Sequence, residues 1–264
     1  MSKVMRTAAT GMLAQQLFID VIANNLANVN TTGFKKSKIE FQDLLYQTIR
    51  AAGSSNLQGS FVPTELQVGS GTRPVATQKI FSQGEIVATG NIFDLAINGN
   101  GFFQINMPDG TFRYTRDGSF KISEIGILVT SDGFPLQPQI RIPEGIEGLN
   151  IEVAMDGQVY AKIYGQETLQ NLGQIQTVQF INPAGLKNVG QNLYEFTYAS
   201  GAPIIGTPGI DGAGTILQRY LESSNVDIVE EMVNMIVAQR SFETNSKAVQ
   251  AADDMLNTSN QLRR

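Results

Sequence analysis

The chain has 264 residues, a net charge of −5 and a sequence pI near 4.9, and it contains no histidine, cysteine or tryptophan. The acidic balance argues against a nucleic-acid-binding protein, which needs a basic face. Without cysteine and histidine the chain lacks the residues for a disulfide, a thiolate or imidazole metal site, a thiol nucleophile or a Ser-His-Asp triad.

The N-terminus carries Lys3 and Arg6 but does not match a secretory leader, because Gln15, Gln16 and Asp20 interrupt the stretch that follows. No run of about 18 apolar residues occurs either, so we expect no membrane-spanning helix. Any export is therefore expected to proceed without a cleaved signal peptide.

Residues 3–29 are predicted to form a helix with an apolar residue at every seventh position. Such a heptad stripe is typical of helices that pack along a narrow seam. The stripe consists of Met5, Met12, Ile19 and Leu26, and Ala8, Gln15, Ile22 and Val29 lie three positions further on. Gly11 is a local weakness of this helix. Gly33 is its predicted C-terminal stop.

Residues 46–79 are polar, rich in glycine, serine and threonine, and contain Pro63 and Pro74. This composition is typical of a flexible or extended linker. A structureless run of this length is uncommon inside a compact domain. We therefore expect the segment to be functional, or to be ordered by something outside the subunit.

Residues 80–220 show short alternating apolar runs that are separated by Asp-Gly pairs. The stretch "GFFQINMPDGTFRYTRDGSFKI" contains two hairpin signals in succession, and "GILVTSDGFPLQP" adds a third. Strands at this spacing predict an antiparallel sandwich or barrel.

A second long helix is predicted from residue 226 to about residue 258, with Ser224 and Asp227 as a capping box at its start. Its seven-residue pattern continues without a glycine or proline. The predicted seam residues are Ile228, Met232, Met235, Phe242, Val249, Met255 and Leu256, and the row three positions after Ile228 holds Glu231, Ala238, Asn245 and Ala252.

The two chain ends carry opposite charge. Residues 1–40 hold five basic and two acidic residues, and residues 220–264 hold four basic and seven acidic ones. Opposite charge favours pairing of the two ends, although exposed ion pairs contribute only about 0–1 kcal/mol each.

No pattern in the sequence indicates a catalytic, cofactor-binding or metal site. The Gly-x-Gly of residues 98–101 precedes a strand-like run, whereas a dinucleotide loop would precede a helix. The Asp-Gly pairs lack the ligand ladder of a calcium loop and are explained by turns. The neighbouring carboxylates Glu230–Glu231 and Asp253–Asp254 point about 100° apart on a helix, so we expect them to face solvent.

The chain ends also carry a family resemblance. The stretches "ANNLANVNTTGFKK" (23–36) and "SSNVDIVEEMVNMIVAQRSFETNSKAVQAADDML" (223–256) resemble the paired terminal signatures of the bacterial flagellar rod and hook proteins. The run "DLAINGNGFFQI…DGTFRYTRDGSF" resembles the central β domain of that family. The chain length and the 46–79 segment resemble the distal-rod type. One departure is Ile92-Phe93, where relatives often carry a proline-containing turn.

The resemblance implies an α+β fold in four parts. These are an N-terminal helix of the inner-core layer (1–45), an extended rod-specific segment (46–79), a central antiparallel β domain (80–220) and a C-terminal helix of the inner-core layer (221–264). The two terminal helices would pair in a coiled-coil-like layer.

The resemblance also implies a non-enzymatic subunit of the flagellar distal rod. Copies would leave the cytoplasm through the flagellum's own type III export channel and assemble helically into a hollow, rigid shaft across the periplasm. The expected partners are other copies of the chain, proximal rod proteins, the hook protein and the P-ring and L-ring proteins. No nucleic acid, small-molecule substrate or cofactor is expected.

Four asparagines, Asn24, Asn25, Asn28 and Asn30, crowd the end of the first helix although asparagine is a poor helix former. We interpret the first three, with Asn245, as amides that hydrogen-bond across seams between subunits and fix their register, at a cost in stability. Their alternative role is a solvated helix face or a cap, and Asn30 is assigned to a cap or turn. Before assembly, both chain ends are expected to be largely disordered.

Other functions remain open at the level of the residues. A hook or proximal-rod subunit of the same family is the nearest alternative. A β-rich adhesin with helical stalks would need an exposed pocket or aromatic patch, and a hydrolase would need convergent carboxylates. An ordinary globular protein with two helices packed on its sheet would also fit the pattern alone.

Overall fold

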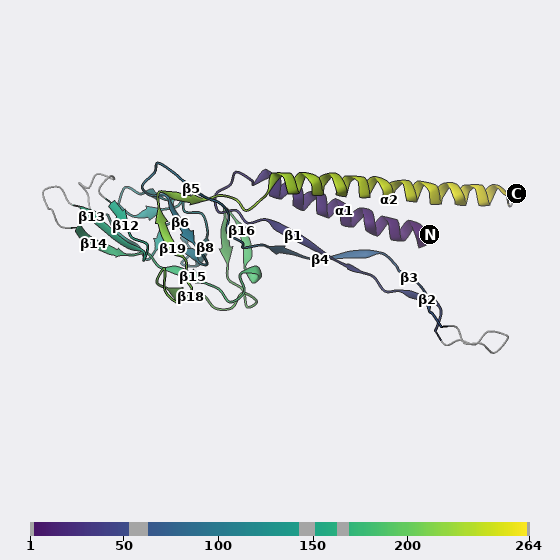
Figure 1. The fold of residues 1–264 in the computed structure, drawn as a ribbon, viewed down its shortest axis with the longest axis horizontal. Helices are drawn as coiled ribbons and strands as arrows, with labels where there is room; N and C mark the ends of the chain where they lie inside the picture. Colours follow the sequence, from purple (N-terminus) through teal and green to yellow (C-terminus); the bar gives the residue numbers. More distant parts are fainter. Residues whose placement is uncertain (1–2, 53–62, 143–150, 163–168, 263–264) are drawn as a thin grey trace. The chain divides into compact units, whose positions relative to one another are not determined.

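The computed structural model describes residues 3–52, 63–142, 151–162 and 169–262. Two long helices lie at the ends of the chain, and the stretch between them is rich in antiparallel strands (Figure 1). The predicted α+β class is therefore confirmed.

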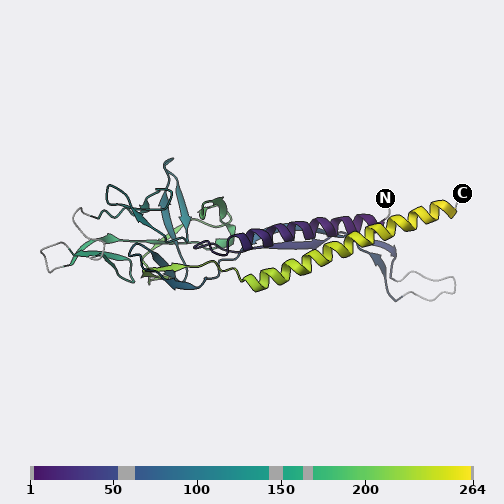
Figure 2. The same cartoon turned by 90° about the horizontal axis from the view of Figure 1, so that it is seen from above.

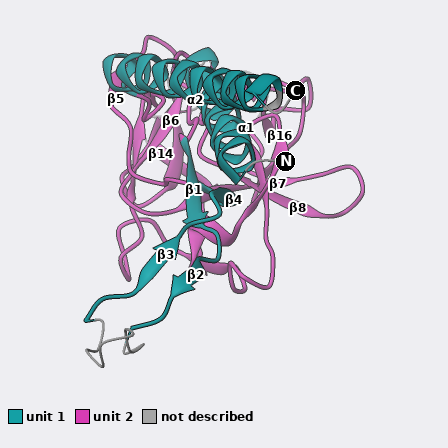
Figure 3. Ribbon diagram, turned by 90° about the vertical axis from the view of Figure 1, so that its right-hand side faces the viewer, with its two compact units in different colours: residues 1–27, 37–78, 227–264 teal, residues 28–36, 79–226 magenta. Residues whose placement is uncertain are grey.

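The chain divides into two compact units (Figure 3). Unit 1 comprises residues 1–27, 37–78 and 227–264, and unit 2 comprises residues 28–36 and 79–226. Each unit therefore consists of segments that are far apart in the sequence. The four-part division that follows from the family resemblance stays a prediction.

Unit 1 contains both helices, α1 (Lys3–Ala27) and α2 (Ile228–Leu262). They lie side by side and run in opposite directions, so that the N-terminal end of α1 and the C-terminal end of α2 lie at the same end of the pair (Figures 1 and 2).

Helix α1 ends at Ala27, before the predicted seam residues Asn28 and Val29. The chain turns directly after the helix, where the backbone N–H of Thr31 donates to the carbonyl oxygen of Asn28 at 3.1 Å. Gly33 follows with a φ of +66°, a conformation that glycine adopts without steric cost. The predicted helix was therefore two residues too long, and Asn30 lies in the turn as expected.

Helix α2 begins with a single acidic cap. The Asp227 carboxylate accepts hydrogen bonds from the backbone N–H groups of Val229 at 2.8 Å and Glu230 at 3.1 Å, as an N-cap residue does. The predicted capping box was wrong, because the Ser224 hydroxyl accepts from Val226 and lies ahead of the helix.

Unit 1 also contains a ribbon of paired strands. Strand β1 (Ser37–Asp43) pairs with β4 (Thr72–Lys79), and β2 (Gln47–Arg50) pairs with β3 (Leu66–Val68). Much of segment 46–79 is thus strand-paired, while its residues 53–62 lie outside the described part of the chain. Within the unit, α1 lies between α2 and this ribbon (Figure 3).

Unit 2 is built around one large antiparallel sheet. Strand β7 is central to it, and the neighbouring strands of this sheet pair in antiparallel fashion. The strands of this sheet, in spatial order, are β16 (Lys187–Gly190), β17 (Leu193–Glu195), β8 (Phe112–Thr115), β7 (Phe102–Asn106), β15 (Thr177–Gln179) and β18 (Ile204–Gly206), with β11 (Leu136–Gln137) also paired to β7.

Smaller strand groups complete the unit. The three-stranded group is β12 (Ile151–Val153), β13 (Gln158–Lys162) and β14 (Leu169–Gln174). The pairs are β6 (Leu95–Asn98) with β19 (Thr215–Gln218), β5 (Ile86–Ala88) with β20 (Tyr220–Glu222), and β9 (Lys121–Ile122) with β10 (Leu128–Val129).

Strand β7 has a buried cluster on each face, because successive side chains of a strand point to opposite sides. Phe103 and Ile105 belong to a mostly aliphatic cluster that also includes Leu95, Leu136 and Phe120. Phe102 belongs to a second cluster, whose rings meet edge to face: Phe102 with Phe81, Phe180 and Tyr194, and Tyr114 with Phe180. Unit 2 therefore has a complete core within a single copy of the chain.

Two of the predicted turns form hairpins and one does not. Gly110 has a positive φ angle and connects the paired strands β7 and β8. Gly133, in the third signal, also has a positive φ angle and lies between Val129 and Pro135, which form an antiparallel bridge. Asp117-Gly118 connects β8 to β9, which do not pair with each other, so the second hairpin of that stretch was predicted wrongly. Gly118 instead permits a close backbone approach, because a Cβ atom there would lie 1.6 Å from the carbonyl oxygen of Leu95.

We therefore expect the substitution Gly118→Ala to lower the free energy of unfolding of the full-length protein by more than about 2 kcal/mol, since backbone would have to move. Urea unfolding measures this. The control is Gly206→Ala, where no atom lies within 4 Å of the added Cβ and the change should stay within about 0.5 kcal/mol. Equal losses in both variants would contradict the steric explanation.

Candidate functional site

The two helices of unit 1 meet along small and polar side chains. On α2 the row Glu231, Ala238 and Ala252 is buried, with Asn245 half-buried in the same row. On α1, Gly11 lies against Asn245, where a Cβ atom would come within 2.9 Å of the amide nitrogen. Small residues let two helix backbones approach closely, so this row determines how the pair packs.

The opposite face of α2 is apolar and exposed. Five side chains at helical spacing, each 50–71% exposed, form a surface that we call the α2 ridge: Val229, Met232, Val233, Ile236 and Val237. At about 100° per residue these positions lie on the side of α2 opposite the buried row. The ridge ends at Arg240, which is exposed and continues the same face.

The predicted seam residues fall into three groups by exposure. Ile22, Asn25 and Ala238 are buried. Those that are half-buried are Met5, Met12, Ile19, Leu26, Asn28, Val29, Met235, Asn245 and Val249. Those that are exposed are Asn24, Ile228, Met232, Phe242, Met255 and Leu256. The buried contact thus follows the small row rather than the large apolar row that the sequence emphasises.

Glu231 also departs from the expected solvent-facing position. It is only 5% exposed, whereas its neighbour Glu230 is exposed. Both carboxylates lie in the first turn of α2, where negative charge interacts favourably with the helix dipole. Asp253 and Asp254 are both exposed, as predicted.

The Asn25 amide makes its hydrogen bonds inside the chain. Its Nδ2 donates to the carbonyl oxygen of Ser37 at 2.9 Å, and its Oδ1 accepts from the Ser37 backbone N–H at 2.9 Å. Asn25 is 1% exposed. The prediction that Asn25 bonds to other subunits was therefore wrong: this amide joins the last turn of α1 to the first residue of β1.

A groove of about 610 Å³ runs along the side of α1 that faces the strand ribbon. Leu17, Asp20, Val21 and Asn24 of α1 form one wall, and the other wall consists of Ser37, Ile39, Pro74, Val75, Ala76 and Thr77 of β1 and β4. The lining is mostly apolar, and Asp20 is its one charged residue. This groove was not predicted, because the composition of the ribbon that forms one wall is typical of a linker.

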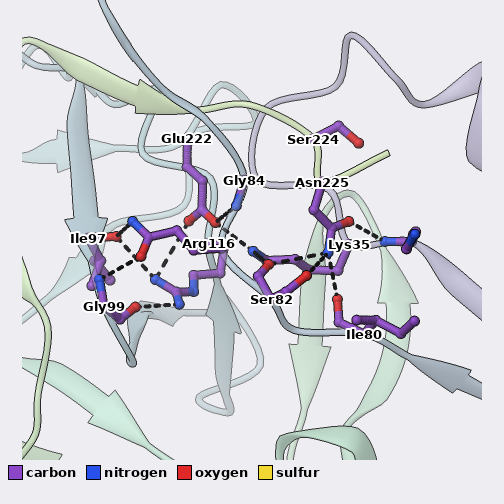
Figure 4. Close-up of polar contacts among 12 residues, drawn as sticks. Lys35, Ile80, Ser82, Gly84, Ile97, Gly99, Arg116, Glu222, Ser224 and Asn225 are labelled. Atoms are coloured by element: carbon purple, nitrogen blue, oxygen red, sulfur yellow. Dashed lines mark hydrogen bonds and ion pairs between the residues drawn. The ribbon is translucent and has the colours of Figure 1, made fainter. Parts of the chain in front are cut away.

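Unit 2 contains a buried cluster of charges, which we call the polar junction (Figure 4). Lys35 and Glu222 are almost fully buried, and the Lys35 Nζ lies 2.5 Å from the Glu222 Oε1. Lys35 also donates to the carbonyl oxygen of Ser82 at 2.6 Å, and the Gly84 backbone N–H donates to Glu222 at 2.9 Å. Burial lowers the pKa of the Lys35 ammonium, and the Glu222 carboxylate opposes that shift.

Arg116 approaches the other carboxylate oxygen of Glu222. Its Nη1 lies 3.6 Å from Glu222 Oε2, and its guanidinium donates to the carbonyl oxygens of Ile97 at 3.3 Å and Gly99 at 2.6 Å. Burial lowers the pKa of Arg116, and Glu222 again acts in the opposite direction. Two buried cations from distant parts of the sequence, Lys35 and Arg116, therefore share the carboxylate of Glu222.

Asn225 extends the junction. Its Oδ1 accepts from the backbone N–H of Lys36 at 2.7 Å, and its Nδ2 donates to the carbonyl oxygens of Ile80 at 2.8 Å and Ser82 at 3.2 Å. These bonds join the three segments of unit 2 that adjoin the unit boundaries, namely 28–36, 79–84 and 222–226. The side chains of the polar junction bond to one another and to backbone atoms, which indicates a structural role.

Within the described ranges, no group of three or more His, Cys, Asp or Glu residues is arranged to hold a metal ion. The two helices described in unit 1 are also too polar to cross a bilayer. The polar junction, the α2 ridge and the α1 groove are therefore the features that bear on function.

Three family models match successive parts of the chain. They are "Flagella basal body rod protein" at residues 5–35, "Flagellar hook protein FlgE/F/G D1 domain" at 96–161 and "Flagellar basal body rod FlgEFG protein C-terminal" at 217–262. The chain is also 50% identical to the flagellar basal-body rod protein FlgG of Borreliella burgdorferi over 264 residues, which is 100% of both chains. The chain belongs to the flagellar basal-body rod protein family.

Two proteins of Bacillus subtilis show which branch of the rod protein family is nearer. The chain is 39% identical to the basal-body rod protein FlgG over 262 residues, 97% of both chains. It is 30% identical to the flagellar hook-basal body complex protein FlhP over 277 residues, 100% of both chains. The rod protein family is structural and non-enzymatic, and its members are components of the basal body.

We expect the removal of one charge from the polar junction to lower the free energy of unfolding strongly. Lys35→Met would leave the Glu222 carboxylate buried beside Arg116 alone, and we expect a loss of about 3–5 kcal/mol in the free energy of unfolding. Urea unfolding of the full-length protein measures it. Lys187→Met is the control, since Lys187 pairs with Glu195 at 3.5 Å but is 67% exposed; its loss should stay below about 1 kcal/mol.

Glu222→Leu checks the charge explanation, because it would leave both Lys35 and Arg116 buried without a carboxylate. We expect this variant to lose more stability than Lys35→Met, which keeps Glu222 beside Arg116. A smaller loss from Glu222→Leu than from Lys35→Met would contradict the charge explanation.

Proposed function

We propose that this chain is the structural subunit of the flagellar distal rod, and that its copies polymerise helically into a hollow, rigid shaft. The shaft transmits motor torque to the hook, and its lumen serves as the export channel. Membership of the rod protein family supports this role. The structural observation that carries it is the α2 ridge, a large apolar surface that a single copy leaves exposed.

The size of the ridge indicates how many contacts a copy needs. Full burial of an aliphatic side chain contributes about 1.5–3 kcal/mol, so covering five half-exposed residues contributes on the order of 5 kcal/mol. Association of two proteins costs about 4–15 kcal/mol in lost translational and rotational freedom. One such contact is therefore marginal, and a copy held by several neighbours at once is stable. A helical lattice supplies those neighbours.

We further propose that α1 and α2 pair as a coiled-coil-like inner layer of the shaft. The seven-residue spacing of Glu231, Ala238, Asn245 and Ala252 supports this pairing. The predicted seam residues that remain half-buried or exposed would then contact other copies. Asn25 is excepted, because its amide is already bonded within the chain.

The proposed partners are further copies of this chain, proximal rod proteins, the hook protein and the P-ring and L-ring proteins. Export through the flagellar type III channel without a cleaved leader completes the proposal. A hook or proximal-rod subunit is not favoured, because the identity to rod proteins named FlgG exceeds that to the hook-basal body complex protein. A hydrolase is excluded by the non-enzymatic family.

Electron microscopy of the concentrated, purified protein tests the proposal. We expect straight tubes of uniform diameter. Ile236→Asp should abolish them, because it places a charge in the ridge, whereas Ile204→Asp in unit 2 should not. The two isoleucines are matched, at 50% and 53% exposed. Absence of tubes from the unchanged protein, or equal assembly of both variants, would contradict the proposal.

Amide hydrogen exchange tests the state of the chain before assembly. The contact along small side chains buries little apolar surface, while ordering the backbone costs about 1–2 kcal/mol per residue. We therefore expect residues 5–28 to exchange rapidly in the unassembled protein and slowly in the tubes. The core of unit 2 serves as the internal reference and should be protected in both. Strong protection of residues 5–28 before assembly would contradict this expectation.

A further inference from the structure

The α2 ridge and the α1 groove lie on opposite sides of one compact unit. The ridge lies on the side of α2 away from α1, and the groove lies on the side of α1 that faces the strand ribbon. In Figure 3, α1 separates α2 from the ribbon strands β1 and β4. Within one copy, therefore, the ridge cannot enter the groove.

The two surfaces are complementary in shape and polarity. The ridge projects aliphatic side chains at helical spacing, and the groove offers an apolar lining that includes Leu17, Ile39 and Val75. A volume of about 610 Å³ holds a few side chains and not a whole helix. The occupant that fits is thus a row of side chains on the surface of a helix, the recognition mode in which apolar anchors recur at i, i+3 and i+4.

The charges are complementary as well. Asp20 is the one charged residue among those that line the groove. Arg240 continues the ridge by one helical turn beyond Ile236 and Val237, and it is exposed. Glu230 and Glu243 are also exposed beside the ridge, and Arg240 is the basic residue that adjoins it, with a charge opposite to that of Asp20. An unrelated partner is not expected to combine an aliphatic row with a basic residue beside it. A second copy of the chain provides both.

We propose that the α2 ridge of one copy inserts into the α1 groove of the next copy, with Arg240 of the first copy beside Asp20 of the second. This inference rests on the proposed function, since it names the surfaces through which the shaft grows. The contact joins two different patches, so each copy keeps one patch open for a further copy. Such heterologous contacts build open chains, whereas a contact between two identical patches closes as a dimer.

Cysteine crosslinking tests the contact directly, because the chain has no cysteine of its own. One preparation carries only Ile236→Cys and a size tag, and a second carries only Val75→Cys. The two are mixed, concentrated until tubes form, and mildly oxidised. We expect crosslinked pairs of one tagged and one untagged chain from the mixture, and none from either variant alone.

The matched control replaces Val75→Cys by Val189→Cys. Val189 lies in unit 2, is also a valine, and is 49% exposed against 48% for Val75. Crosslinks of Ile236→Cys to Val189→Cys, or of Ile236→Cys to itself, would place the ridge elsewhere and overturn the inference. Tubes that form without any Ile236–Val75 crosslink would also overturn it, while leaving the proposed function intact. Absence of tubes from the unchanged protein would overturn both.

A charge exchange provides a second, independent readout. Asp20→Arg and Arg240→Asp should each raise the protein concentration needed for tube formation roughly two- to fivefold, and the double variant should restore it. Far-UV circular dichroism checks that all three variants keep the fold. If the double variant assembles no better than the single variants, the two residues do not meet in the shaft.

Discussion

The close approach of Gly11 to Asn245 is the constraint on which unit 1 depends. The two helices touch along a row of small and polar side chains, and the five aliphatic side chains of the α2 ridge lie on the outer face of the pair. A single copy therefore leaves a large apolar surface of the helix pair uncovered, and we expect other molecules to cover it.

Unit 2 is built in the opposite way. Both faces of strand β7 are covered by buried clusters, and the polar junction adds three charges that find their partners inside the unit. Buried ion pairs add little net stability compared with apolar residues, but a lone buried charge is costly. We therefore infer that the junction acts chiefly by disfavouring alternative packings of the segments around Lys35 and Glu222.

The periodic features of the sequence predicted much of the fold. Both helices and the antiparallel middle region were correct, since period and turn chemistry are local properties. The face of each helix that meets the other was not predictable in the same way. It depends on how closely two backbones can approach, and Gly11, which reads as a weakness of the helix, is the residue that allows the approach.

Long-range contacts escaped prediction for a related reason. Gly118 looked like a hairpin glycine, but its role is set by the carbonyl oxygen of Leu95. Lys35 was one of the five basic residues counted in residues 1–40, and its carboxylate partner lies 187 positions further on. Asn25 was correctly expected to be a buried amide, but its partner is the nearby Ser37 backbone rather than another subunit. In each case the contacting residue that determines the role is not related to it by any regular spacing in the sequence.

The hydrogen bonds from Asn225 to Ile80 and Ser82 have a consequence for how such chains diversify. They hold together the first and last residues of the continuous stretch 79–226. When the two ends of a stretch are adjacent, residues between them can be inserted, deleted or replaced without displacing the segments on either side. Natural variants of this protein could thus carry very different inserts at this position while keeping the same pair of terminal helices.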